Sequence, residues 1–406
     1  MNLKSLVLLA WLGAGAAIAA PDPAISFLEE RVKRDPDDFV AQNQLASRYL
    51  DLLRVTGDDS FRLKARRAAE ASVAVGLPEL NNGGIAVLAR VQLASHQFAA
   101  ARDTAKTLRK LAPRKSYSFG LLGDALLELG DYKEAGAAFA ELAKAEPGSI
   151  EGETRLAQQA WLQGDPKTAR QHFGNALEEV KKLTPPAPAL AAWCSIQLGH
   201  LAFSQGDWES AGKRYQTALE ALPDYWSALE HIAELKGAQQ NYPEAIALYK
   251  KVIERVPRPE ICQALGDLYA FTAKAAEARP WFERAAATYL KTEEKEGALY
   301  AHHLAGFYAD SVEDPARAVK WAQQDLGSRH NIYAHDAMAW AFYRNGQFAE
   351  ASAEIKEALV LGTKDAHLLF HASMIATANG DLAGGKDFLA RAAAVNPHYN
   401  AFHAHR

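Results

Sequence analysis

The stretch that decides the fold is residues 121–147, which read LLGDALLELGDYKEAGAAFAELAKAEP. It places the small residue Gly123 on a first helix and Phe139 on a second helix. Gly130 lies between them. A residue in the left-handed conformation at this point can hydrogen-bond the last carbonyl groups of the first helix, and glycine adopts that conformation at low steric cost. Pro147 then prevents the second helix from running on. The stretch therefore predicts one helix–turn–helix unit.

A short motif from this unit, a Leu, Ile, Met or Ala followed by a small residue, recurs ten times along the chain. The ten pairs are Leu45-Ala46, Leu88-Ala89, Leu122-Gly123, Leu156-Ala157, Leu198-Gly199, Ile232-Ala233, Leu265-Gly266, Leu304-Ala305, Met338-Ala339 and Ala372-Ser373. Successive small residues are 43, 34, 34, 42, 34, 33, 39, 34 and 34 positions apart, so six of the nine steps lie within one residue of 34. The spacing predicts ten units of one kind, with three insertions.

The pattern resembles the tetratricopeptide repeat, in which Trp, Leu-Gly, Tyr, Ala, Phe and Pro positions on two helices recur every 34 residues. The matching residues are Leu122-Gly123, Tyr132, Ala135, Phe139 and Pro147 in the third unit, Leu198-Gly199, Trp208, Ala211, Tyr215 and Pro223 in the fifth, and Met338-Ala339, Phe348 and Ala351 in the ninth. These positions serve helix packing and not chemistry. The resemblance implies an all-α, right-handed superhelical solenoid of about ten such repeats.

The insertions and the two ends divide the chain further. The predicted organisation is a signal peptide at 1–19, an N-terminal array of about four repeats with an irregular first one at 20–182, a Pro-rich joint at 183–190, a C-terminal array of about six repeats at 191–397, and a tail or partial cap at 398–406. The joint is expected because its cluster of prolines cannot be helical. Unit eight is expected to be the least regular.

The first residues have the features of a secretion signal. Lys4 is followed by an apolar run and then by Ala17-Ile18-Ala19, the small-x-small form that a signal peptidase needs. Cleavage after Ala19 predicts a mature chain that begins near Ala20. No Cys follows the run, so lipid attachment is not indicated, and no later stretch has the ~18 uncharged apolar residues of a membrane span. We expect a soluble protein of the periplasm or the medium.

Composition excludes several classes of function. The 45 basic and 49 acidic residues are mixed along the chain without a basic stripe, so nucleic acid is a poor candidate partner. Two cysteines, Cys194 and Cys262, are too few for a disulfide framework. Phosphate loops, nucleophile elbows and paired-Cys metal sites are missing from the sequence. We therefore predict no catalytic residues, no cofactor and no enzymatic activity.

The resemblance implies that first helices line a concave groove, at positions one, three and six residues from the small residue. From unit five onward these positions are rich in His, carboxylates and aromatic rings. The candidate partner-binding residues are Trp193, His200, Glu230, Glu234, Asp267, His302, Tyr333, Asp336, Trp340, His367 and Phe370. Aromatic anchors with polar groups around them favour a non-catalytic scaffold that binds a protein or peptide in this groove.

A metal-binding or metal-delivery protein is the alternative, because imidazole and carboxylate together suit zinc, nickel or copper. The candidate ligands are His200, Glu234 and His302. Adjacent first helices lie ~10 Å apart, so an ion would need long side chains to bridge them. A solvated polar groove with incidental histidines explains the same residues more simply.

Overall fold

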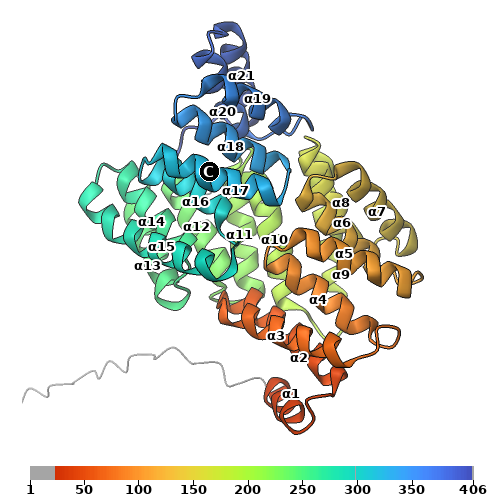
Figure 1. The fold of residues 1–406 in the computed structure, drawn as a ribbon. Coiled ribbons are helices and arrows are strands. Elements are labelled where there is room, and N and C mark those ends of the chain that lie inside the picture. Colours follow the sequence, from red (N-terminus) through yellow and green to blue (C-terminus); the bar gives the residue numbers. More distant parts are fainter. Residues whose placement is uncertain (1–22, 298, 405–406) are drawn as a thin grey trace, which may run out of the picture.

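The computed structural model describes residues 23–297 and 299–404. Within these two stretches the chain forms 21 α-helices, one short π-helical segment and no β-strand (Figure 1). The predicted signal peptide, residues 1–19, lies outside the described residues. None of the helices described is both long enough and apolar enough to cross a bilayer.

Twenty of the helices form ten consecutive packed pairs, preceded by α1 (Pro23–Arg34). The first helices are α2 (Phe39–Thr56), α4 (Asn82–Ala94), α6 (Tyr117–Leu129), α8 (Ile150–Leu162), α10 (Pro188–Phe203), α12 (Trp226–Ala238), α14 (Pro259–Phe271), α16 (Ala301–Gly306) with the π segment η1 (Phe307–Ser311), α18 (Ile332–Arg344) and α20 (Ala366–Ala378). The second helices are α3 (Ser60–Val75), α5 (Phe98–Leu111), α7 (Tyr132–Ala145), α9 (Pro166–Lys181), α11 (Trp208–Ala221), α13 (Tyr242–Arg255), α15 (Ala275–Glu296), α17 (Pro315–Ser328), α19 (Phe348–Ala358) and α21 (Leu382–Val395). The predicted all-α solenoid is confirmed.

An aromatic ring of the second helix lies directly on the small residue of the first helix in several pairs. A Cβ added at Gly123 or at Gly199 would overlap the ring of Phe139 or of Tyr215. Both rings are completely buried. Since an interior packed this closely has no room for another methyl group, the distance between the two helices depends on the glycine.

Each pair turns at a residue with positive φ, whether or not that residue is glycine. The ten turn residues are Gly57, His96, Gly130, Gly164, Gly206, Gln240, Ala273, Glu313, Gly346 and Gly380, with φ between 51° and 91°. The left-handed conformation costs a residue with a side chain about 1–2 kcal/mol. In the four units without glycine, helix packing imposes the turn that the sequence does not signal.

The three long steps of the repeat have separate causes. Helix α2 has 18 residues and helix α15 has 22, against 13 or 14 in most of the others. The predicted joint at 183–190 overlaps the start of α10, because Pro188 fits the first turn of a helix. Unit eight is irregular, since its first helix has six residues and continues as η1.

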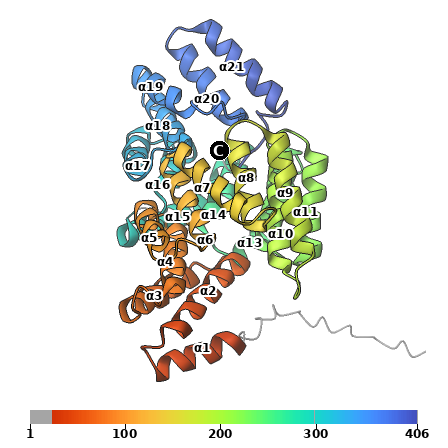
Figure 2. The same cartoon turned by 90° about the vertical axis from the view of Figure 1, so that its right-hand side faces the viewer.

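Units that lie six apart along the chain are in contact, so that neighbouring turns of the superhelix touch (Figures 1 and 2). His330 N, before α18, donates a hydrogen bond to Leu129 O at the end of α6, at 3.0 Å. One unit further along, the Thr363 hydroxyl before α20 donates to Leu162 O at the end of α8. The ninth unit therefore lies on the third, and the tenth lies on the fourth.

A buried charge joins the first unit to the seventh in the same way. Arg62 on α3 is 2% exposed, and its Nη1 donates to Glu296 Oε2 at the end of α15, at 2.7 Å. Its Nε donates to Asp59 at 2.8 Å. The Arg62 guanidinium holds the pKa of Glu296 below its usual value. A guanidinium this deeply buried needs its partners, so the pair fixes the register of the two turns.

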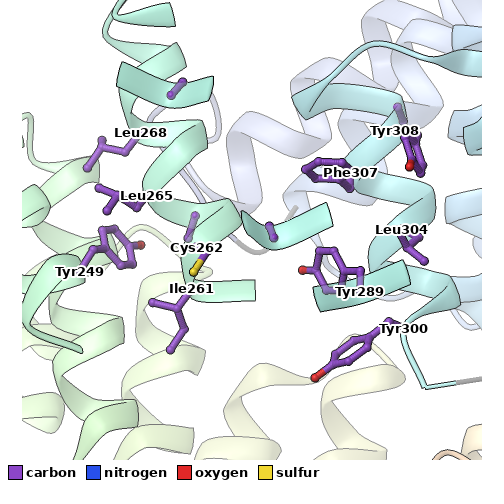
Figure 3. Packing of buried hydrophobic residues seen from close by; sticks show 14 of the residues in the cluster. Tyr249, Ile261, Cys262, Leu265, Leu268, Tyr289, Tyr300, Leu304, Phe307 and Tyr308 are labelled. Atoms are coloured by element: carbon purple, nitrogen blue, oxygen red, sulfur yellow. The ribbon is translucent and has the colours of Figure 1, made fainter. Parts of the chain in front are cut away.

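The largest group of buried apolar residues lies in units six to nine. Figure 3 shows Tyr249, Leu265 and Leu268 on one side of this group, and Tyr289 and Phe307 on the other. Apart from Phe402, which follows the last unit, the buried residues of the group come from four consecutive units, as expected for a continuous solenoid core.

Gly199→Ala is expected to lower the free energy of unfolding by about 1–3 kcal/mol, because the Tyr215 ring must move. Gly174, inside α9, faces open space, so Gly174→Ala is the matched control. The control is expected to be stabilising by about 0.5–1 kcal/mol. Urea unfolding followed by circular dichroism measures both, and equal effects would contradict the packing role of Gly199.

Candidate binding site

Two of the cavities formed by the described residues lie where first helices of successive units face one another. The first cavity, of ≈ 650 Å³, is lined by residues of α6, α8 and α10 and by the turn after α4. The second cavity, of ≈ 450 Å³, is lined by residues of α14, α16, α18 and α20. Both volumes are typical of sites for small molecules or for a few side chains.

Most of the predicted groove residues line one of these cavities. Trp193 and His200 line the first cavity, and Asp267, His302, Tyr333, Asp336, Trp340 and His367 line the second. The helices thus bring together six side chains that the sequence places on four separate first helices.

The remaining three predicted residues lie elsewhere. Glu230 and Glu234 on α12 are 4% and 1% exposed. Phe370 is half-buried between the rings of Trp340 and Tyr399, with centroid distances of 6.5 and 6.1 Å. None of the three lines either cavity, so a position in the repeat did not by itself predict access to the groove.

Trp340 forms the aromatic wall of the second cavity and is held firmly. Its Nε1 lies 3.0 Å from both carboxylate oxygens of Asp310, and Arg344 donates to the same carboxylate at 2.7 Å. The indole ring stacks on Tyr343 at 4.8 Å and on His371 at 4.0 Å. Its orientation is therefore fixed by contacts on both faces and at its polar edge.

The second cavity also contains groups that sequence reasoning missed. His371 is 4% exposed, and its Nδ1 lies 3.0 Å from Asp336 Oδ1. The signal that could have found it is its spacing of four from His367, which is one helical turn. Asp310 was missed because the π segment adds a residue to the turn and rotates the helix that follows.

The lining of the second cavity has more negative than positive charge. It contains five carboxylates, from Glu260, Asp267, Asp310, Asp336 and Asp365. The lining also contains five histidines, and among its residues in the described part of the chain there is no lysine or arginine. A concave site with carboxylates and few cations raises the local concentration of positively charged groups.

His302 belongs to a charge network at the edge of the second cavity. Its Nδ1 lies 2.8 Å from Asp325 Oδ2, and Arg329 Nε donates to the other oxygen of Asp325 at 2.9 Å. Burial alone would raise the pKa of Asp325, but the contacts with His302 and Arg329 outweigh it and lower the pKa to about 2. Asp325 is therefore ionised at neutral pH, and it orients both partners.

The predicted metal ligands do not converge. His200 lines the first cavity, His302 lines the second, and Glu234 lines neither. Across residues 23–297 and 299–404, no group of three or more His, Cys, Asp or Glu side chains could hold a metal ion. The two cysteines are buried, and burial raises the pKa of Cys194 to about 11, which keeps it a thiol.

The first cavity combines aromatic rings with one strong ion pair. Arg155 donates from Nε and Nη2 to the two oxygens of Asp124, at 2.8 and 2.6 Å. Trp161 and Trp193 supply ring surfaces, and Arg329 reaches the cavity from the next turn of the superhelix. The contact between turns thus closes this cavity on one side.

Comparison with known families agrees with the repeat. The family model described as "Tetratricopeptide repeat" matches residues 87–150 and 196–258. No curated protein matches the chain. With the ten-unit register and the packed helix pairs, this match supports a protein built of tetratricopeptide repeats. Arrays of this family are typically scaffolds for protein interactions.

Three solved structures are similar to parts of the chain. The thermophilic TPR protein TTC0263 of Thermus thermophilus has 19% identity and a TM-score of 0.39, over 47% of this chain and 98% of that one. The human IFIT1 dimer with PPP-AAAA has 12% identity and a TM-score of 0.46, over 92% and 95%. The structure of Naa15/Naa10 bound to HypK-THB has 18% identity and a TM-score of 0.30, over 92% and 61%.

His96, at the edge of the first cavity, predicts a pH dependence of stability. Burial, and then the charge of Arg329, lower the pKa of His96 to about 4, against 6.5 without these influences. Between pH 6.5 and 4 the unfolded chain therefore binds a proton that the folded chain does not, so stability falls as the pH falls. In His96→Asn, which suits the left-handed turn, this part of the slope is expected to vanish. Urea midpoints across that pH range measure it, and an unchanged slope would contradict the burial of His96 between turns.

Proposed function

We propose that this protein is a non-catalytic scaffold that binds a partner protein or peptide inside its solenoid, with the second cavity as the principal site. The observation that supports the proposal is the convergence of six predicted groove residues on one cavity. Solenoid proteins bind partners on surfaces that several successive repeats build together.

The chemistry of the second cavity favours a partner segment with a cationic side chain. The ring of Tyr333 can cover the apolar stem of a lysine or arginine. The carboxylates of Asp267 and Asp336 line the same cavity and can receive the charged head. A volume of ≈ 450 Å³ admits one or two side chains, so the rest of the partner must lie outside this cavity.

Cross-linking and affinity capture from the native cell envelope test this proposal, with wild type compared with an Asp267→Asn, His367→Ala double variant. The double variant is expected to capture at least tenfold less partner, because it lacks a carboxylate and an imidazole of the lining. Quantitative mass spectrometry measures the captured proteins. The partner's bound segment is expected to contain Lys or Arg.

The matched control is Lys386→Ala, Asp387→Asn on α21, where Asp387 is 67% exposed. This control is expected to capture as much partner as wild type. Circular dichroism checks that both variants are folded. Equal capture by the folded cavity variant and by wild type would overturn the assignment to the second cavity.

We also propose that the protein acts in the periplasm or outside the cell. The support is the sequence of residues 1–19, with Lys4, an apolar run and the small residues Ala17 and Ala19. Intact-mass measurement after cell fractionation is expected to find a chain that begins near Ala20 outside the cytoplasm. A cytoplasmic chain that retains residues 1–19 would refute this location.

A further inference from the structure

The tail segment, defined as His398–Ala404, turns back into the interior of the molecule after α21 (Figures 1 and 2). It forms no regular helix or strand. Its side chains contact α10, α11, α12 and α14, which belong to units five to seven, one superhelical turn earlier. The tail segment therefore lies in a groove built by other repeats.

Phe402 is the apolar anchor of the tail segment. It is 2% exposed and belongs to the largest core group. Its ring lies over Gly237 on α12, where an added Cβ would stand 2.6 Å from the ring. The Phe271 ring at the end of α14 meets it edge to face at 5.7 Å. Gly237 thus leaves a notch that fits an aromatic side chain.

Glu234 is the polar anchor, one helical turn before Gly237 on α12. This carboxylate is 1% exposed. It accepts a hydrogen bond from Ala404 N at 2.7 Å, and His403 Nδ1 lies 2.6 Å from the same oxygen. A carboxylate this deeply buried is costly unless it is hydrogen-bonded, and the tail segment supplies two of its contacts.

A third anchor lies at the start of the tail segment. The His398 ring stacks on Trp208 of α11 at 4.0 Å. The chain just before it, at Asn396 and Pro397, lies against the turn residue Gly206 of unit five. Because unit nine lies on unit three and unit ten on unit four, the tail segment lies where an eleventh unit would contact unit five.

The tail segment leaves the last helix largely uncovered. On α21, Leu382 is 61% exposed and Leu389 is 37% exposed. A segment whose role was to cap the array would cover this outer apolar face. Its aromatic and polar anchors instead fit the interior groove, in the manner of a bound peptide.

We infer that the groove holding the tail segment is a peptide-binding site occupied in cis. It would accept from a partner an extended segment with an aromatic residue followed by a histidine or similar donor, and with a free backbone N–H one residue later. The inference rests on the proposed function in that both place a partner segment inside the solenoid. Since Phe402, His403 and Ala404 also line the second cavity, displacing the tail segment would open that cavity to the partner.

The test uses a chain that ends at Pro397 and a fluorescent peptide with the sequence of residues 396–406, NPHYNAFHAHR. Fluorescence anisotropy is expected to show micromolar binding to the shortened chain. The full chain is expected to bind the peptide on the order of a thousandfold more weakly, because a tethered segment has a millimolar effective concentration. A peptide with Phe402→Ala is expected to bind at least tenfold more weakly.

A pair of matched variants of the shortened chain tests the binding site of the Phe402 ring. Gly237→Ala is expected to weaken peptide binding at least tenfold, since its methyl group would occupy the notch for Phe402. Gly212→Ala in α11, where an added Cβ would lie an ordinary 3.4 Å from Leu235, is expected to leave binding unchanged. A folded shortened chain that does not bind the peptide would overturn the inference.

If the shortened chain does not fold, the full chain with a protease site inserted after Pro397 replaces it. After cleavage of the folded protein, the released tail segment is expected to exchange with excess labelled peptide. Lack of exchange would show a permanent structural segment and overturn the inference. If a partner is captured but the peptide does not exchange, this inference is refuted and the proposed function stands. If the peptide exchanges but no partner is captured, the proposed function is refuted and this inference stands.

Discussion

The contact between an aromatic ring of one helix and a small residue of the next sets the geometry of each helix pair. At Gly123 and Gly199 the ring lies where a Cβ would otherwise stand, so the two helices approach closely. A ring lies in the same way on Gly266, and the same left-handed turn joins the two helices of every pair. Repeated rotation produces the superhelix, in which units six apart come into contact.

Contacts between neighbouring turns enclose the concave side of the superhelix. An open superhelix would present its first helices to solvent as a long groove. Here the contacts of His330 with Leu129 and of Thr363 with Leu162 stack one turn on the next. The interior is divided into separate cavities, and groups such as Arg62 become buried between the turns. Access for a partner depends on the openings that remain, and the tail segment occupies part of that interior.

The candidate site was predictable to the extent that it follows the repeat. Asp267 and Trp340 were found because each has a fixed offset from the small residue of its own unit. His371 was not found because it lies on α20 two residues before the small residue of its unit, an offset that the repeat does not assign to the groove. Asp310 was not found because it lies in a π segment that breaks the register. Glu234 has the correct offset and is nevertheless buried, because the tail segment contacts it. Offsets describe one unit at a time, whereas exposure depends on what packs against it.

The sequence by itself determined the helix pairs, their number, their order and their family, because these follow from spacings of up to about 34 residues that each unit repeats. Only the tertiary structure decided which turns touch, which carboxylates meet in the second cavity, that Arg62 pairs with Glu296, and where the tail segment lies. The carboxylates of the second cavity come from neighbouring units, but the other contacts join residues about 170 to 230 positions apart. They depend on the rotation accumulated over six units. A small difference in the angle between successive units, which no local spacing encodes, would separate the residues that are in contact.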